Sequence, residues 1–140
     1  MESWGAVKRT YLDTSVLIEA FQGKNDAAVR ALEVLDDPER QFVVSDFLRL
    51  EVLPKPTFLH RTEEVQFMRT FFEHAEEDVP SSKEVTGYAL DLAAKYDMGA
   101  MDALHVGTAL MADVDELVTL EKETNPMCCV REVKVISLHS

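Results

Sequence analysis

Cysteine is scarce in this chain of 140 residues, and so are basic side chains and long apolar runs. The only two cysteines, Cys128 and Cys129, are adjacent, so a disulfide between them would be strained, and two thiolates are too few for a zinc site. No apolar run approaches the roughly 18–20 residues that span a bilayer. Residues 1–6 lack the basic and apolar regions of a signal peptide. These absences predict a reduced, cytoplasmic protein that does not enter a membrane.

Basic side chains number 14 against 26 acidic ones, which gives a formal net charge of −12. Such a charge opposes binding to a polyanion unless positive residues are concentrated in one place. The hydrophobic content of 46% fits a globular chain with a substantial core. We therefore expect a single domain over residues 1–140.

Short β-rich runs alternate with helical patterns along the chain. The patterns predict strands over 8–13, 41–44, 116–120 and 133–137, and helices over 16–21, 25–35, 46–53, 62–75, 82–96 and 100–112. Thr14 and Ser15 offer N-caps for the first helix, and Pro54 and Pro56 are expected to end the third. Strands separated by helices predict a parallel sheet covered on both faces, with its site beyond the carboxyl ends of the strands.

Four acidic residues follow predicted strands or lie in helices near them: Asp13, Glu51, Asp102 and Glu121. Carboxylates that converge repel one another unless protons or cations neutralise them. No matching set of cysteines or histidines accompanies them, so hard ions such as Mg²⁺ or Mn²⁺ are favoured, and phosphate-ester chemistry is their usual work. Taken singly, each acid also has an ordinary explanation, as a helix N-cap, a partner of the helix dipole or a solvent-facing charge.

The acids lie in four recognisable segments: Tyr11-Leu-Asp-Thr-Ser-Val-Leu-Ile-Glu19, Ser45-Asp-Phe-Leu-Arg-Leu-Glu-Val52, Met101-Asp-Ala-Leu-His-Val-Gly-Thr-Ala109 and Leu117-Val-Thr-Leu-Glu121. In this order and spacing they resemble the PIN-domain ribonucleases, and the chain is similar in size to the VapC-type toxins of that family. The first and third segments are the most specific. The resemblance implies a three-layer α/β/α fold with a central, mostly parallel sheet.

The same resemblance implies an activity. The four acids would surround one or two Mg²⁺ or Mn²⁺ ions, and an activated water would attack RNA in line and leave a 5′-phosphate. Supporting roles are implied for Thr14, Ser15, His105 and Thr119. The implied partners are an RNA substrate and a basic antitoxin of the VapB sort, which would place an Arg or Lys among the carboxylates. We also expect a homodimer.

The fourth acid departs from the family pattern, which usually has Asp within Val-Thr-x-Asp. Glu121 carries one more methylene group, and Glu123 lies close by. We therefore expect Glu121 to contact the ion from further back or through water, and to matter less for activity than the other three acids.

Residues 45–61 hold three basic side chains against two acidic ones. This local excess predicts a lip that contacts RNA phosphates through Arg49, Lys55 and Arg61. Phe58 and His60 are available for stacking on bases. The alternative is a loop pinned by prolines that carries ordinary surface charges.

Two other functions compete with a ribonuclease. A phosphatase of the haloacid-dehalogenase kind also has an Asp after the first strand, but it needs a second Asp two residues on, where this chain has Ser15. A non-catalytic PIN-like module that binds RNA or a partner protein is the stronger alternative. A nuclease assay with added Mn²⁺ separates that module from the enzyme.

Overall fold

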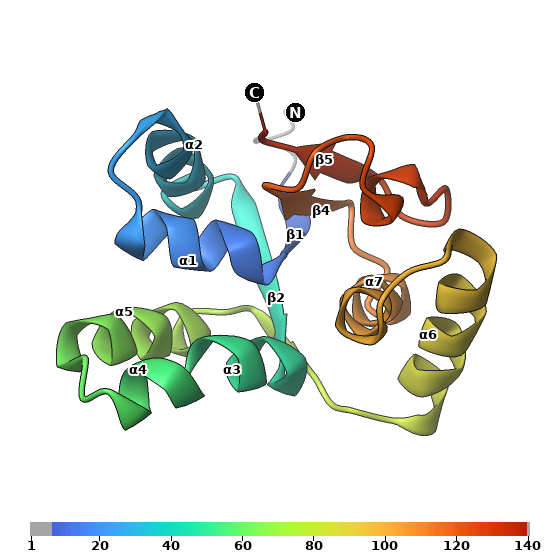
Figure 1. The fold of residues 1–140 in the computed structure, drawn as a ribbon, viewed down its shortest axis with the longest axis horizontal. Coiled ribbons are helices and arrows are strands. Elements are labelled where there is room, and N and C mark those ends of the chain that lie inside the picture. Colours follow the sequence, from blue (N-terminus) through green and yellow to red (C-terminus); the bar gives the residue numbers. More distant parts are fainter. Residues whose placement is uncertain (1–6, 140) are drawn as a thin grey trace, which may run out of the picture.

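Five parallel strands form the central sheet of the computed structural model, which describes residues 7–139 (Figure 1). The strands are β1 (Lys8–Leu12), β2 (Arg40–Ser45), β3 (Glu77–Val79), β4 (Glu116–Thr119) and β5 (Val135–Ser137). Their order across the sheet is β3-β2-β1-β4-β5, and each adjacent pair runs parallel. The carboxyl ends of all these strands therefore point the same way, and we call that end of the sheet the carboxyl edge.

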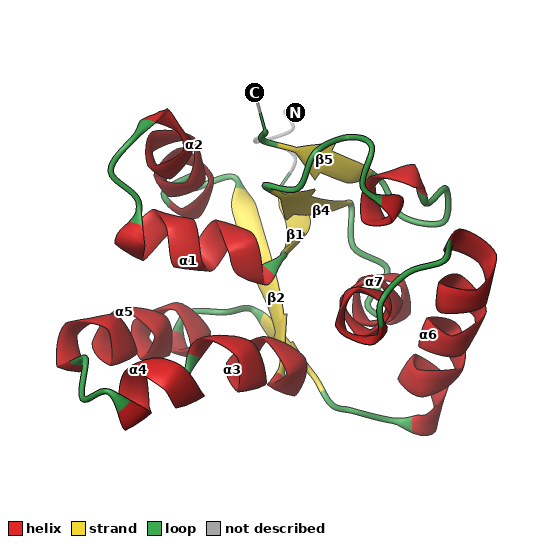
Figure 2. Cartoon of the chain, in the orientation of Figure 1, coloured by secondary structure: helices red, strands yellow, loops and turns green. Residues whose placement is uncertain are grey.

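Helices cover both faces of the sheet. They are α1 (Thr14–Gln22), α2 (Asp26–Leu35), α3 (Asp46–Val52), α4 (Pro54–Phe58), α5 (Thr62–Glu73), α6 (Lys83–Tyr96) and α7 (Ala100–Met111), with the 3₁₀ turn η1 at Pro126–Cys129. Helices α1 to α5 lie on one side of the strands, and α6 and α7 lie on the other (Figure 2). The predicted three-layer α/β/α fold with a parallel sheet is thus confirmed. Among the described helices, none is both long and apolar enough to cross a membrane.

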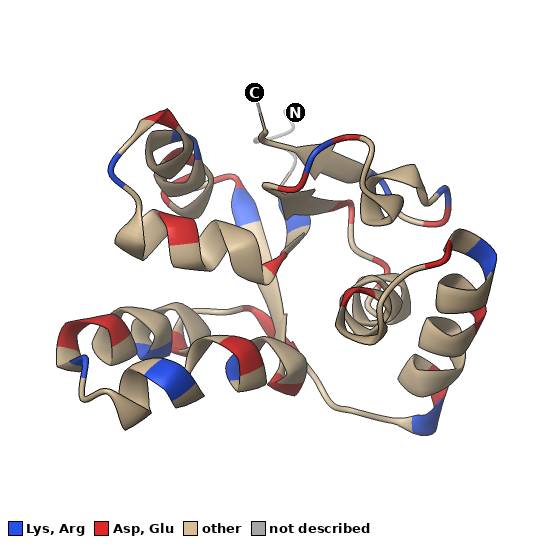
Figure 3. Cartoon of the chain, in the orientation of Figure 1, with Lys and Arg blue, Asp and Glu red and all other residues tan. Residues whose placement is uncertain are grey.

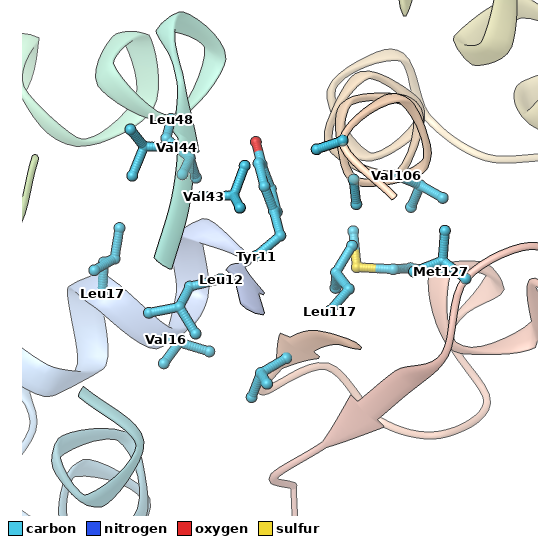
Figure 4. Close-up of a cluster of buried hydrophobic side chains, with 14 of the residues drawn as sticks. Tyr11, Leu12, Val16, Leu17, Val43, Val44, Leu48, Val106, Leu117 and Met127 are labelled. Atoms are coloured by element: carbon cyan, nitrogen blue, oxygen red, sulfur yellow. The ribbon is translucent and has the colours of Figure 1, made fainter. Parts of the chain in front are cut away.

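Strand β1 lies at the centre of the core. Tyr11 and Leu12 are fully buried, and Figure 4 shows them surrounded by side chains from α1, β2 and α7. On the far side of α7, the helix packs closely on α6: a Cβ atom on Gly107 would lie 3.2 Å from the carbonyl oxygen of Val85. Because glycine has no side chain, the backbones of α6 and α7 can lie close together, and this close packing holds α7 in place.

A buried ion pair links β2 to β4 across β1. The Nε atom of Arg40 lies 2.7 Å from Oε2 of Glu116, whose side chain is only 2% exposed. The hydroxyl of Thr10 on β1 donates to the same oxygen at 2.7 Å, and Arg40 also pairs with Asp37 at 2.9 Å. Arg40 and Glu116 begin their strands. The ion pair therefore lies toward the amino ends of the strands, away from the carboxyl edge.

Three local features differ from the sequence prediction. Pro54 begins a further helix, α4, because proline suits the first turn of a helix, where its missing N–H has no helical partner. The three-residue strand β3 was not predicted, because Glu77 and Asp78 give it no apolar pattern. The expected N-cap at Thr14 or Ser15 is also wrong: Asp13 occupies the N-cap position and makes no capping hydrogen bond, while Thr14 is already helical.

Candidate functional site

Asp13 follows β1 at the carboxyl edge and is only 5% exposed. Its backbone N–H donates to the Val118 carbonyl at 2.9 Å, which continues the pairing of β1 with β4. Its Oδ2 atom accepts hydrogen bonds from the hydroxyls of Ser15, at 2.8 Å, and Thr119, at 2.9 Å. Asp13 is the N-cap residue of α1, but its side chain does not cap the helix. Its buried carboxylate is oriented instead by hydroxyls from α1 and β4.

Glu51 reaches the carboxyl edge from α3. Its Oε1 atom accepts a hydrogen bond from the Thr14 hydroxyl at 2.7 Å and lies 2.5 Å from Nε2 of His105 on α7. The hydrogen bond from His105 holds the pKa of Glu51 below its usual value, and the bond from Thr14 acts in the same direction. Because its pKa is lowered, this carboxylate is charged near neutral pH. Its side chain is 32% exposed, so it remains open to solvent.

Asp102 lies in the first turn of α7 and is partly buried. Burial raises the pKa of its carboxyl above the usual value, and the negative charges of Asp13 and Glu121 raise it further. Glu51 acts in the same direction, while His105 opposes it. The other three predicted acids thus all act electrostatically on Asp102. Acidic positions at the end of β1, on α3 and on α7 surround the centre of the molecule in Figure 3.

Glu121 lies in the loop after β4. It follows β4 by two residues and is exposed. Its backbone N–H donates to the Thr119 hydroxyl at 3.0 Å, and its carboxylate accepts a hydrogen bond from Asn125 at 3.2 Å. Because its charge still affects Asp102, Glu121 lies within electrostatic reach of the cluster while its side chain is held by a neighbour in the following loop.

The four carboxylates suit a divalent ion in their chemistry. Within residues 7–139, no three Asp, Glu, His or Cys side chains stand close enough together to hold one ion at once. The donor set nevertheless consists of carboxylate oxygens, the ligands that Mg²⁺ and Mn²⁺ prefer. A cation would also relieve the repulsion that raises the pKa of Asp102. The donors therefore fit such an ion, provided that the side chains move closer together around it.

Comparison with known proteins identifies the family. The family model described as the PIN domain matches residues 10–125. The chain belongs to the PIN domain family. This span includes Asp13, Glu51, Asp102 and Glu121. No curated protein matches the sequence of this PIN domain.

Several solved structures share its fold. A toxin–antitoxin complex from Klebsiella pneumoniae aligns with a TM-score of 0.69 at 23% identity, over 91% of this chain and 96% of that one. DNA-bound VapBC from Salmonella typhimurium aligns with a TM-score of 0.70 at 15% identity, over 93% and 98%. VapBC2 from Rickettsia felis, bound to a promoter DNA fragment, gives 0.67 at 16% identity, over 92% and 98%. At these identities the likeness establishes the shared fold.

Two residues of the PIN-domain site were missed in the sequence. The hydroxyl of Tyr11 lies 2.8 Å from Nδ1 of His105 and 2.8 Å from the hydroxyl of Ser45. Tyr11 is buried in the core, yet it stands two residues before Asp13, which follows β1 and keeps the extended backbone of the strand. Residues two apart on a strand point to the same face, so this spacing was the signal that could have associated Tyr11 with the site.

The basic residues of the predicted phosphate lip have different surroundings. Arg49 donates two hydrogen bonds to Asp78, at 3.1 and 2.8 Å, so its charge is already engaged. Arg61 lies 3.8 Å from Glu64, and Lys55 is exposed on α4. Most of this segment is helical rather than a proline-pinned loop, and ordinary surface charges remain the alternative. Contact between this lip and RNA stays a prediction, and Lys55 is its best-placed member.

Proposed function

We propose that this PIN domain is a divalent-metal-dependent endoribonuclease and the toxin of a toxin–antitoxin pair. The main support is electrostatic: the negative charges of Asp13, Glu51 and Glu121, carried by separate segments of the chain, all raise the pKa of Asp102 at the start of α7. Like charges held near a partly buried carboxyl oppose its ionisation unless a cation neutralises them. A divalent ion bound there would activate water as the nucleophile and neutralise charge on the phosphate.

The residues of the chain have distinct tasks in this proposal. Asp13, Glu51 and Asp102 would hold the ion. Ser15 and Thr119 would keep the Asp13 carboxylate in place through their hydrogen bonds to Oδ2. The half-open position of Glu51 leaves solvent access for a water molecule and a phosphodiester. No serine or histidine need act as a nucleophile.

The antitoxin is supported by the charge and by an apolar surface. A net charge of −12 favours a basic protein partner, because complementary charge speeds and selects association. Helices α3 and α4 form a groove in which Leu50 is 64% exposed and Phe58 is 81% exposed, and exposed apolar groups of this kind mark interaction sites. Structures with the same fold include toxin–antitoxin complexes. A small gene for a basic protein directly upstream would further support the pairing.

A second candidate is a PIN domain without catalytic activity that binds RNA or a partner protein. The observation that favours it is the absence, within residues 7–139, of three acids already gathered closely enough to hold one ion. The outward position of Glu121 points the same way. The two candidates differ in whether the carboxylates bind a divalent ion that supports RNA cleavage.

We expect the protein to cleave single-stranded RNA in millimolar Mn²⁺ or Mg²⁺, to lose that activity in EDTA and to leave 5′-phosphate ends. Either ion should also raise the melting temperature, because a ligand that binds only the native state stabilises it by mass action. Gel analysis of end-labelled RNA and a thermal melt in the same buffers measure both effects. A thermal shift without cleavage supports the non-catalytic candidate, and the absence of both effects would falsify the metal site itself.

We expect Glu121→Ala to lose less cleavage activity than Glu51→Ala. Glu121 is exposed and held by Asn125, whereas Glu51 is fixed by Thr14 and His105 between two helices. Single-turnover cleavage rates at saturating Mn²⁺ compare the two variants. Glu121→Asp, which restores the usual residue of the family, is the matched control and should retain activity. Equal and complete loss in both alanine variants would show that Glu121 is a full ligand.

A further inference from the structure

A chain of hydrogen bonds begins at Leu48 on α3, passes through the core and returns to Glu51 on the same helix. The backbone N–H of Leu48 donates to Oγ of Ser45 at 3.3 Å. Ser45 lies 2.8 Å from the Tyr11 hydroxyl, which lies 2.8 Å from Nδ1 of His105. The other ring nitrogen of His105 contacts Glu51 at 2.5 Å. The chain joins β1, β2, α3 and α7, and Figure 4 shows Tyr11 extending from β1 between β2 and α7.

Burial keeps water away from the middle of this chain. Tyr11 and Ser45 are fully buried, and His105 is 1% exposed. Each hydroxyl and each ring nitrogen must therefore find its partner within the protein, because a buried polar group without one destabilises the fold. The direction of every bond then follows from the end at Glu51.

At one end of the chain, a carboxylate only accepts, so Nε2 of His105 must carry the proton that points at Glu51. With the single ring proton on Nε2, Nδ1 can only accept, and the Tyr11 hydroxyl at 2.8 Å is the donor within reach. Because Tyr11 gives its proton to Nδ1, its oxygen accepts the proton of Ser45, whose own oxygen accepts from the Leu48 N–H. Every hydrogen bond in the chain therefore donates in the same direction, toward Glu51.

We infer that His105 is a positioning residue: held by Tyr11 and Ser45 with its proton on Nε2, it donates to Glu51 and fixes that carboxylate between α1 and α7. The ring can neither rotate nor change tautomer without breaking a buried hydrogen bond to Tyr11 or Glu51. Thr14 completes the restraint from α1, because its hydroxyl donates to the same Glu51 oxygen. Residues that orient ligands in this way commonly change metal affinity or activity about 10–100-fold when they are lost.

The tautomer is testable in the metal-free protein, whatever the function. Long-range ¹H–¹⁵N spectra of histidine-labelled protein in mildly alkaline buffer should show His105 with a proton on Nε2 and none on Nδ1. His105→Gln assigns the resonance by removing it. In Tyr11→Phe, the Nδ1 resonance should shift because it loses its donor, while Nε2 stays protonated. A proton on Nδ1 in the unmodified protein, alone or together with one on Nε2, would overturn the inference.

The effect on Glu51 is tested by two variants of His105, each of which keeps a polar group at only one of the two ring-nitrogen positions. The amide nitrogen of His105→Gln takes the place of Nε2 and can still donate to Glu51, whereas the shorter His105→Asn reaches only toward Tyr11. We expect the asparagine variant to bind Mn²⁺ about 10–100-fold more weakly and the glutamine variant to retain most of the affinity. Isothermal titration with Mn²⁺ alone measures this difference without reference to activity.

Tyr11→Phe should also weaken Mn²⁺ binding, and Tyr96→Phe is its matched control. Tyr96 loses an equally short hydrogen bond, to Glu132 on the surface, and should leave Mn²⁺ affinity unchanged. The part of the inference that concerns metal binding rests on the proposed function. If neither the unmodified protein nor any variant binds Mn²⁺, the proposed function fails while the tautomer result stands. If the protein binds Mn²⁺ and His105→Asn binds it equally well, the positioning role is wrong.

Discussion

Asp13→Asn and Asp102→Asn are each expected to reduce metal-dependent RNA cleavage by more than about 100-fold, beyond the usual cost of changing an outer-shell residue. The amide that replaces Asp13 can still accept hydrogen bonds from Ser15 and Thr119 through its oxygen, so the fold should survive. Single-turnover cleavage in Mn²⁺ measures the loss, and far-ultraviolet circular dichroism verifies the fold. Asp91→Asn, which removes one exposed acid from α6, is the matched control and should cleave normally. Normal cleavage by either site variant would remove that residue from the site.

Asp102→Asn has a second expected signature, in the metal-free protein. The pKa of Asp102 is raised by burial and by the neighbouring acids. A carboxyl whose pKa is higher in the folded state than in the unfolded chain destabilises the fold where it is ionised in both states. The variant should therefore melt higher than the unmodified protein at neutral pH in EDTA. The difference should shrink as the pH falls through the raised pKa of Asp102 and vanish below the pKa of the unfolded chain.

The fold could be predicted from the sequence because buried parallel strands appear as short apolar runs between amphipathic helices. The elements that escaped prediction are those whose residues suit another role. Glu77 and Asp78 make β3 look like a loop, and only its pairing with β2 makes it a strand. Pro54 reads as the end of a helix, whereas in the structure it begins one.

The site could be predicted only in part. Strand ends and short helices identified the four acids, because a parallel sheet brings its carboxyl ends together. Some partners of these acids, such as Thr119 for Asp13 and His105 for Glu51, come from distant segments, and sequence spacing does not reveal those contacts. Tyr11 reads as a core residue, and it is also the partner of His105. The local charge count around Arg49 likewise omitted Asp78, which lies 29 residues further along the chain.

The buried ion pair and the candidate site lie at opposite ends of the same sheet. The buried pair of Arg40 and Glu116 joins three strands near their amino ends, while the acids of the site lie at the carboxyl edge. Substitutions at the two ends should therefore have separable consequences. Changes to the acids should affect metal binding and cleavage, whereas changes to the ion pair should affect the free energy of unfolding.

Arg40→Met is accordingly expected to lower the free energy of unfolding by about 3–5 kcal/mol, because it leaves Glu116 buried without its cation. Thr10 would remain as the only partner of that carboxylate described above, and one hydroxyl cannot neutralise a charge. Unfolding in urea, monitored by circular dichroism, measures the loss. Arg69→Met, at an exposed position on α5, is the matched control and should change stability by less than about 0.5 kcal/mol.

The double variant Arg40→Met, Glu116→Leu distinguishes a lost ion pair from lost packing. Replacing both members of a buried pair with apolar groups is often neutral or stabilising, so the double variant should recover most of the stability lost in Arg40→Met. Below its unfolding temperature, Arg40→Met should cleave RNA at the rate of the unmodified protein, since the pair lies away from the carboxyl edge. If the double variant is less stable than Arg40→Met, the pair contributes through packing. If Arg40→Met stays folded but no longer cleaves, the two ends of the sheet are coupled and the separation described above is wrong.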